Sequence, residues 1–331
     1  MKKGKHVNDQ TVCEICATIK QLCSYGLRKR EACRLIGIPL SSYHSYSKRN
    51  SKGYLPVKRI KKSAGTHAIR EEEKDAIIEY ALEHPSYYHR ELAWKMIDEN
   101  VAFVSMTTVY RILKGKGLIC SQNIKSNYGW VHRYSNEASE PDELWQADIT
   151  YLRYRGRDVY QLSFIDVFSR FIVYTITLLR MDGMTVSSAF EDFVNNNLKN
   201  LCRIPRLQTD NGSCFVGSEF RSLMKDIDVE HVTIHPSTPT ENVIIERWHR
   251  TFKELLSEED EPESFENLKI SIANVCNYYN YKRYHASIGY ITPYTAYRGK
   301  PQEIFDERTR KLHDAKLLRQ NKNKELLSIS Y

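Results

Sequence analysis

Three consecutive strand-like segments, followed by alternating helical and strand-like segments, most strongly constrain the fold of this chain. The strand-like segments lie near residues 144–154, 158–166 and 170–178, and Tyr154-Arg-Gly-Arg-Asp158 is typical of the turn between the first two. The pattern then predicts helix 184–200, strand 204–209, helix 217–227, strand 229–234 and helices near 242–256 and 264–281. This order predicts an α/β domain with a mixed sheet that begins as an antiparallel meander.

The first 120 residues carry helical patterns only. A helix near 28–36 and another near 40–48 are separated by Gly37-Ile-Pro39, which is a helix-turn-helix pattern. Three further helices are expected near 71–83, 89–100 and 106–114, and Ser105 is the expected N-cap of the last. Each group could bind DNA, or could instead serve packing or dimerisation.

These patterns divide the chain into six parts. We expect a helix-turn-helix-like module at 1–50, a basic linker at 51–66, a second helical module at 67–120, a linker at 121–140, a catalytic core at 141–300 and a basic tail at 301–331. Thr292-Pro293 suits a helix start near the end of the core. The pattern of the tail specifies no structure.

Charge is unevenly distributed along the 331 residues. Residues 1–135 contain 24 Lys and Arg against 12 Asp and Glu, whereas residues 136–331 contain 25 against 29. The basic N-terminal part is therefore expected to bind double-stranded DNA. The residues predicted to contact DNA in the two helical modules are Ser42, His44, Thr107, Thr108, Arg111 and Lys114.

Composition predicts a cytoplasmic protein without a membrane-spanning segment. No apolar run approaches the length of a membrane span, and the start of the chain lacks the apolar stretch of a signal peptide. The eight cysteines show no framework spacing and are expected to be reduced. Cys13-x-x-Cys16 could hold zinc, but the spacing of Cys13, Cys16 and Cys23 with Ile19 favours a small apolar core.

Three carboxylates in different local contexts indicate the chemistry. Asp148 lies within the first expected strand, Asp210 ends a short apolar run, and Glu246 falls in a helical pattern with 35 residues between it and Asp210. Two strand carboxylates and one helical carboxylate can converge on divalent cations. Mg²⁺ prefers oxygen ligands and is usually held by few carboxylates plus phosphate oxygens, so the pattern suits phosphoryl transfer on a phosphodiester.

Each carboxylate also has a simpler interpretation. Asp210-Asn-Gly is a strong turn signal, and Glu246 with Arg250 four residues later would be an ordinary ion pair on a surface helix. Asp148 between apolar residues is harder to dismiss, because a buried carboxylate needs a partner.

The helix that carries Glu246 has two distinct faces. One is an apolar stripe that should face a core, formed by Ile245, Trp248, Phe252, Leu255 and Leu256. A separate arc holds Asn242, Glu246, His249, Arg250 and Lys253. Next to a bound phosphodiester, Asn242, Arg250 and Lys253 would contact the DNA backbone.

The stretch 145–253 resembles the catalytic core of retroviral-integrase-type transposases. The shared motifs are Trp145-Gln-Ala-Asp148-Ile-Thr-Tyr, Asp166-Val-Phe-Ser169-Arg170, Thr209-Asp210-Asn-Gly212-Ser-x-Phe215 and Asn242-x-x-x-Glu246-Arg-x-His249-Arg250-Thr-x-Lys253. The segments 279–293 and 33–43 are similar to parts of the orfB-type product of bacterial insertion sequences. Ala147, Tyr284 and Ile288 depart from the usual pattern, where Thr, Pro and Leu are common.

The resemblance implies an RNase H-like α/β core preceded by two all-α modules, with Asp148, Asp210 and Glu246 as catalytic and metal-ligating residues. It further implies two Mg²⁺ or Mn²⁺ ions, hydrolysis at the element ends and transfer of the freed 3′ hydroxyl to target DNA, without a covalent enzyme intermediate. The expected partners are the terminal inverted repeats, target DNA, further copies of the chain on DNA and an upstream-frame product, and DNA binding would place the protein at the nucleoid. The alternatives are a phage or retroelement integrase, an RNase H-like nuclease, and a DNA-binding regulator without catalysis.

Overall fold

The computed structural model describes residues 9–51, 66–119, 138–197, 203–235 and 239–329. The chain divides into two compact units: Met1–Ile69 with Leu318–Tyr331, and Arg70–Leu317. Most of the predicted linkers at 51–66 and 121–140 lies outside the described residues. No helix among the described residues is long and apolar enough to cross a membrane.

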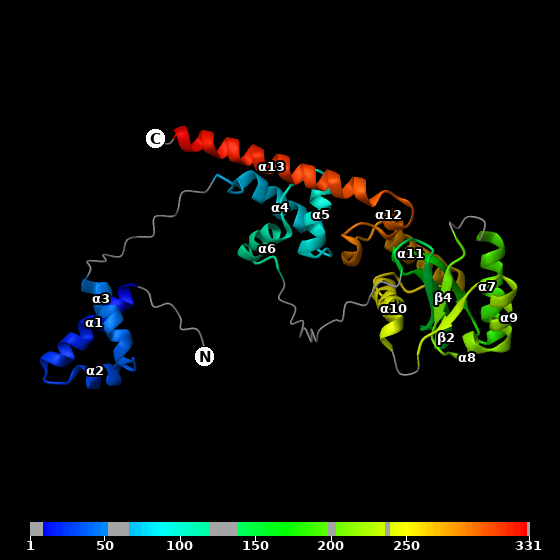
Figure 1. Cartoon of the computed structure of the whole chain (residues 1–331), viewed down its shortest axis with the longest axis horizontal. Helices are drawn as coiled ribbons and strands as arrows, with labels where there is room; N and C mark the ends of the chain where they lie inside the picture. Colours follow the sequence, from blue (N-terminus) through cyan, green and yellow to red (C-terminus); the bar gives the residue numbers. More distant parts are fainter. Residues whose placement is uncertain (1–8, 52–65, 120–137, 198–202, 236–238, 330–331) are drawn as a thin grey trace. The chain divides into compact units, whose positions relative to one another are not determined.

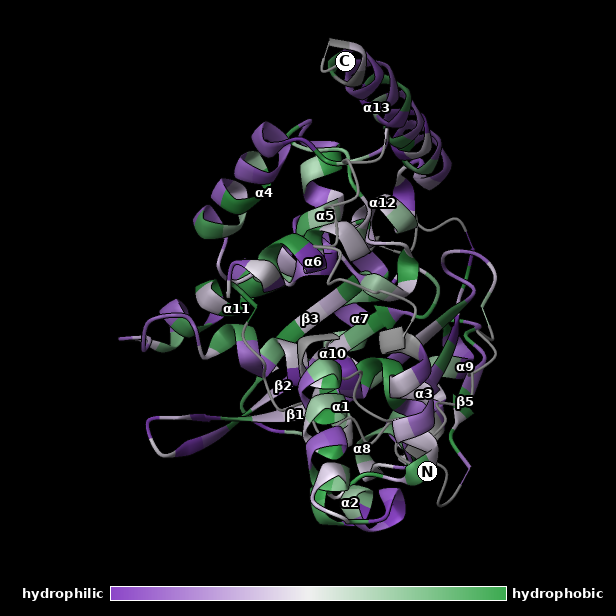
Figure 2. Cartoon of the chain, turned by 90° about the vertical axis from the view of Figure 1, so that its left-hand side faces the viewer, coloured by the Kyte–Doolittle hydropathy of each residue, from purple (hydrophilic) through white to green (hydrophobic). Residues whose placement is uncertain are grey.

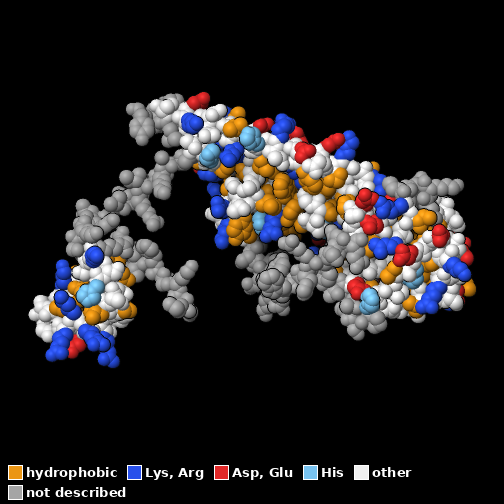
Figure 3. Space-filling view, viewed as in Figure 1, with side chains coloured by type: hydrophobic (Ala, Val, Ile, Leu, Met, Phe, Trp, Pro, Cys, Tyr) orange, Lys and Arg blue, Asp and Glu red, His pale blue; other side chains and the backbone are white. Residues whose placement is uncertain are grey.

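The first unit contains the helices α1 (Asp9–Ser24), α2 (Lys29–Ile36) and α3 (Leu40–Ser51). The predicted helix-turn-helix pattern is confirmed: α2 ends at Gly37, whose φ of 77° gives the left-handed conformation that glycine favours. Cys16 and Cys33 lie in the apolar core of the three helices with Ile19, and burial raises the pKa of both thiols. Several Lys and Arg side chains are exposed on the face of this unit seen in Figure 3.

The second helical module belongs to the larger unit. Its helices are α4 (Glu71–Glu83), α5 (His89–Asp98) and α6 (Met106–Gly115), close to the predicted bounds. The Ser105 side chain caps α6 by accepting a hydrogen bond from the backbone N–H of Thr108, as predicted. Helix α5 ends two residues before the predicted Asn100, which has a φ of 61° and cannot continue the helix.

A five-stranded mixed sheet forms the center of the larger unit, in the order β3-β2-β1-β4-β5. Strands β1 (Leu144–Tyr154), β2 (Arg157–Asp166) and β3 (Ile172–Leu178) form the predicted antiparallel meander. The short strands β4 (Arg206–Thr209) and β5 (His231–Thr233) extend the sheet in parallel with β1.

Helices cover both faces of this sheet (Figure 1). One face packs against α7 (Gly183–Asn197) and α9 (Ser218–Asp226) around Trp145, Leu162 and Phe164. The other packs against α10 (Val243–Leu256) and α11 (Phe265–Tyr281) around Ile165, Trp248 and Phe252. The predicted helix 217–227 is α9, and the short helix α8 (Ser213–Val216) that precedes it was not predicted. The expected RNase H-like class, a mixed sheet flanked by helices after two helical modules, is confirmed.

Short helices complete the core, and the tail is helical from Pro301 to Ile329. Two single turns, η2 (Pro239–Asn242) and η3 (Ala286–Ile288), precede α10 and α12 (Pro293–Arg298) respectively, and Thr292 caps α12 as predicted. The tail for which the sequence specified no structure is the 29-residue helix α13 (Pro301–Ile329), which is hydrophilic over most of its length (Figure 2). Contacts of its first half with the second helical module explain why this region belongs to the larger unit.

Candidate active site

Parallel pairing of β1 with β4 brings Asp148 and Asp210 together. Ala147 is the partner of Thr209 in this ladder, and each aspartate is the next residue of its chain. The side chain of Asp148 is 21% exposed, and its Oδ1 accepts a hydrogen bond of 2.7 Å from the Ile149 backbone N–H. The two carboxylates, 62 residues apart in sequence, therefore lie on neighbouring chain segments where β4 ends beside the middle of β1.

The turn after β4 holds the side chain of Asp210 in place. Its Oδ1 accepts a 3.0 Å hydrogen bond from the Gly212 backbone N–H. A Cβ at Gly212 would lie 2.9 Å from the same oxygen, so a larger residue would push the carboxylate aside. The Asp-Asn-Gly triplet thus forms a turn, and that turn also fixes the orientation of a carboxylate.

Helix α10 carries Glu246 along the sheet face toward which Asp148 projects. The predicted apolar stripe is confirmed, because Ile245, Trp248 and Phe252 are buried in the core between α10, α11 and the sheet. Glu246 lies on the exposed part of the helix.

The three carboxylates influence one another electrostatically. The pKa of Asp210 is raised, first by burial and then by the charge of Asp148. The pKa of Glu246 is also raised, by burial and by the charge of Asp148, while His249 acts in the opposite direction. Asp148 is therefore the common neighbour of the other two carboxylates.

The donor set fits a hard divalent cation. Among the described residues, no group of three or more His, Cys, Asp and Glu side chains is arranged to hold a metal ion. Carboxylate oxygens are the ligands that Mg²⁺ prefers, and Mg²⁺ keeps several waters and needs only one or two carboxylates from the protein. Asp148, which acts on both Asp210 and Glu246, offers carboxylate ligands of this kind together with its two neighbours.

Two buried side chains, His249 on α10 and its N-cap Asn242, belong to the arc that the sequence assigned to Glu246, but the contact of His249 with Asp148 was not predicted. His249 lies with Nδ1 3.4 Å from Oδ2 of Asp148, and its Nε2 is buried without a hydrogen-bond partner among the described residues. The Oδ1 of Asn242, one turn before Glu246, is likewise buried and unpartnered in the described part of the chain. The helical pattern placed both on one arc with Glu246, but which part of that arc faces β1 depends on how α10 packs.

The predicted DNA-contacting residues occupy three helices. Arg250 and Lys253 are exposed on α10, and Arg250 Nε lies 3.9 Å from Glu254 rather than pairing with Glu246. Thr107, Arg111 and Lys114 are exposed on α6, whereas the hydroxyl of Thr108 lies 3.0 Å from that of the N-cap Ser105. Ser42 and the exposed His44 lie on α3 in the other compact unit.

Several residues of the recognised motifs hold the fold rather than line the carboxylate group. Asp166 is fully buried and accepts hydrogen bonds from the backbone N–H and hydroxyl of Ser169 and from the backbone N–H of Asp142. Burial raises its pKa. The Asn280 amide donates to the carbonyl of Ile172 and accepts from its N–H, at 2.9 and 2.8 Å, and so attaches α11 to β3. These contacts explain the motifs physically without any role in catalysis.

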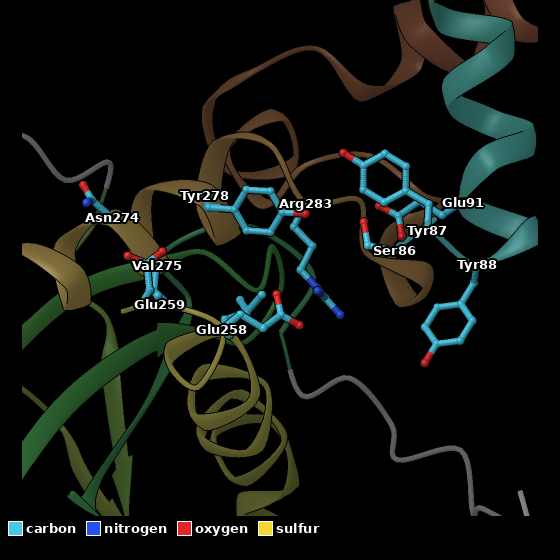
Figure 4. Close-up of a pocket in the computed structure, with 11 residues that line it drawn as sticks. Ser86, Tyr87, Tyr88, Glu91, Glu258, Glu259, Asn274, Val275, Tyr278 and Arg283 are labelled. Atoms are coloured by element: carbon cyan, nitrogen blue, oxygen red, sulfur yellow. The ribbon is translucent and has the colours of Figure 1, made fainter. Parts of the chain in front are cut away.

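A cavity of about 240 Å³ lies elsewhere in the larger unit (Figure 4). Tyr87 and Glu91 from the second helical module, and Tyr278 and Arg283 at the end of α11, are among the residues that line it. None of the three carboxylates does. This cavity is a separate feature from the candidate active site.

Comparisons with known proteins point to one domain family. Two family models, both described as an integrase core domain, match residues 138–239 and 227–293. The transposase for insertion sequence element IS904 of Lactococcus lactis subsp. lactis is 27% identical over 158 residues, which is 47% of this chain and 62% of that protein. An uncharacterized 39.2 kDa protein of insertion element IS476 from Xanthomonas euvesicatoria is 24% identical over 270 residues, 81% of this chain and 71% of its own length.

A viral relative matches the same region. The Gag-Pro-Pol polyprotein of human T-cell leukemia virus 2 is 24% identical over 136 residues, 41% of this chain and 9% of the polyprotein. The chain thus spans less than two thirds of the length of this polyprotein and of the IS904 transposase. Among solved structures, the HTLV-2 integrase catalytic core domain in complex with magnesium aligns with 49% of this chain and 99% of its own, with 21% identity and a TM-score of 0.41. The family matches and the relatives agree: residues 138–293 match models of the integrase core domain, and the chain is similar to insertion-sequence transposases.

Proposed function

We propose that this protein is a DNA transposase that cleaves at the ends of an insertion element and joins the freed 3′ hydroxyl to target DNA. The main support for the proposal is the pairing of Ala147 with Thr209 within residues that match an integrase core domain model, because Asp148 and Asp210 follow these two residues and the helix of Glu246 packs on the same sheet. The insertion-sequence relatives support the substrate class.

Asp148, Asp210 and Glu246 are the proposed metal ligands. Two Mg²⁺ or Mn²⁺ ions bound there would supply activation of the attacking oxygen and stabilisation of the leaving oxygen. The chain's own contribution is to hold the carboxylates: β1 and the turn at Gly212 fix the two aspartates, and α10 presents the glutamate. No side chain needs to act as a covalent nucleophile, since water or a DNA hydroxyl attacks phosphorus.

The remaining proposed site residues would position DNA. Asn242, Arg250 and Lys253 lie on the same helix as Glu246, and the two cations are exposed where they can meet phosphate oxygens next to the carboxylates. The exposed face of α6 with Thr107, Arg111 and Lys114 would contact a duplex, with Thr108 at the start of the same helix, and Ser42 and His44 on α3 would make further contacts. Their targets would be the terminal inverted repeats and target DNA, bound by several copies of the chain together and with an upstream-frame product.

Product analysis tests this function. The full chain is incubated with a labelled duplex that ends in the element's terminal repeat, together with target DNA and Mg²⁺ or Mn²⁺. Joined products that depend on the metal are expected. Hydrolysis without any joining would identify an RNase H-like nuclease, and DNA binding with neither product would identify a regulator without catalysis.

A further inference from the structure

A single buried side chain contacts all three elements that carry the carboxylates. Gln146 on β1 is 3% exposed and lies two residues before Asp148. Its Nε2 donates hydrogen bonds to Oε1 of Gln208, at 2.8 Å, and to the backbone carbonyl of Glu241, at 2.6 Å. Its Oε1 accepts a 3.2 Å hydrogen bond from the backbone N–H of Ile245.

Each of these partners is adjacent to a part of the candidate active site. Gln208 is the direct partner of Gln146 in the parallel ladder and lies two residues before Asp210, so the two glutamines repeat the arrangement of the two aspartates. Ile245 immediately precedes Glu246, and Glu241 lies in the turn η2 that leads into α10. Side chains alternate along a strand, so Gln146 and Asp148 project from the same face of β1, the face that α10 covers.

The bond to Ile245 replaces a missing helix cap. The first backbone N–H groups of a helix have no partner within the helix and usually bond to the side chain of the N-cap residue. Asn242, the N-cap of α10, makes no such side-chain bond. Gln146 from β1 accepts one of these N–H groups instead. The start of α10 is therefore tied to the strand that carries Asp148.

We infer that Gln146 is a positioning residue that sets the distance of Glu246 from Asp148 and Asp210. The inference rests on the proposed function, and it adds to the three ligands a residue that acts through their backbones. A primary amide suits this position because it donates twice and accepts, as the three contacts require. A carboxylate would lack both donors, and an apolar side chain would leave the Gln208 amide and the Ile245 N–H without their buried partner.

The first test replaces Gln146 with methionine, which has a similar length and no comparable hydrogen-bonding capacity. In the metal-free, DNA-free protein, hydrogen exchange at the Ile245 amide should accelerate by at least about tenfold, since its acceptor is gone. In the strand-transfer assay the joining rate should fall by about 100-fold, because misplacement of reacting groups by about 1 Å costs that much. The affinity for the DNA end should stay within about twofold, as no DNA-contacting side chain changes.

Gln161→Met is the matched control. Gln161 on β2 is also a fully buried amide in the same sheet, but its side chain bonds to the hydroxyls of Thr175 and Thr177 on β3. It should lower stability while leaving the exchange of the Ile245 amide and the joining rate within about threefold of the wild type.

Gln208→Met provides a second, milder variant should Gln146→Met fail to fold. It removes one acceptor of Gln146 and retains the bond to Ile245, so exchange at Ile245 should stay slow while joining falls by about tenfold, because only the link between the two strands is weakened. Equal joining rates for Gln208→Met, Gln161→Met and wild type would overturn the inference. So would Ile245 exchange that is unaffected by Gln146→Met.

These readouts separate the inference from the proposed function. A wild-type protein that joins no DNA would refute the proposed transposase activity. Exchange at Ile245 in the metal-free protein would still decide whether Gln146 holds the start of α10.

Discussion

Arg308 on α13 is 3% exposed and is surrounded by hydrogen-bond acceptors and aromatic rings. Its Nε and Nη2 donate to the two carboxylate oxygens of Asp98 at 2.8 and 2.6 Å, and the guanidinium also donates to the carbonyls of Gly289 and Tyr290. The Tyr284 hydroxyl donates to Asp98 as well, at 2.7 Å. This cluster attaches the second helical module to α13 and to the C-terminal part of the catalytic core.

Asp98→Asn keeps the shape of the side chain but leaves Arg308 buried without its counter-charge. Breaking a buried ion pair costs about 3–5 kcal/mol, and because the Asp98 side chain is 22% exposed we expect a loss near the lower end, about 3 kcal/mol. The loss should appear as a lower urea midpoint, and hydrogen exchange should accelerate in α5 and in the first half of α13.

Glu307→Gln on the same helix is the control. Glu307 pairs with Arg310, but their side chains are 43% and 63% exposed, so this change should cost about 0.5 kcal/mol. Asp98→Leu combined with Arg308→Met removes both charges and should recover part of the loss. Equal effects of Asp98→Asn and Glu307→Gln would refute the reasoning.

Three further predictions concern other parts of the larger unit. Asn280→Ala removes both hydrogen bonds to Ile172 and should cost about 2–3 kcal/mol in urea unfolding, whereas Ala at the exposed Asn277 of the same helix should cost under about 1 kcal/mol. Burial lowers the pKa of His285 from 6.5 to about 4, so the unfolded chain takes up a proton between these values while the folded chain does not. The contribution of neutral His285 to the free energy of unfolding is therefore complete above about pH 6.5 and decreases by up to about 3 kcal/mol toward pH 4. His285→Gln should flatten this dependence. An unchanged slope of stability against pH in this variant would contradict the burial argument. Replacing the exposed Arg111 and Lys114 with Ala should weaken duplex binding and reduce the salt slope of log K by about 2, and unchanged binding would return α6 to a packing role. The full chain is needed here, because a fragment that ends at residue 135 would lack Arg308, the buried partner of Asp98.

Local patterns were sufficient for most of the secondary structure. Period-two alternation identified β1 to β3, and capping residues such as Ser105 and Thr292 located helix starts, because these signals depend only on neighbouring residues. The helix α13 was not predicted, because its sequence is mostly polar. Its first half is held instead by partners more than 200 residues away, such as Asp98 for Arg308.

The sequence identified which residues form the candidate site, but it could not predict which side chains contact one another there. The spacing of Asp148, Asp210 and Glu246 singled them out, whereas the contacts of Gln146 with Gln208 and Ile245 depend on the register of β1 with β4 and on how α10 packs. No local pattern encodes that register. A departure from the family pattern has a similar explanation: Tyr284, where Pro is common, supplies the hydroxyl that bonds to Asp98.

The central claim is that Asp148, Asp210 and Glu246 act together on a metal-dependent DNA substrate, and strand transfer by charge-removing variants tests it most directly. Asp210→Asn retains an oxygen that can accept from Gly212, and Glu246→Gln changes an exposed helical residue, so both proteins should melt within a few degrees of the wild type. Joining of a labelled element end with Mg²⁺ or Mn²⁺ should fall by at least about 100-fold in each, because a neutral amide is a poor ligand for a hard cation. Joining at near wild-type rates by either folded variant would contradict the three-carboxylate site.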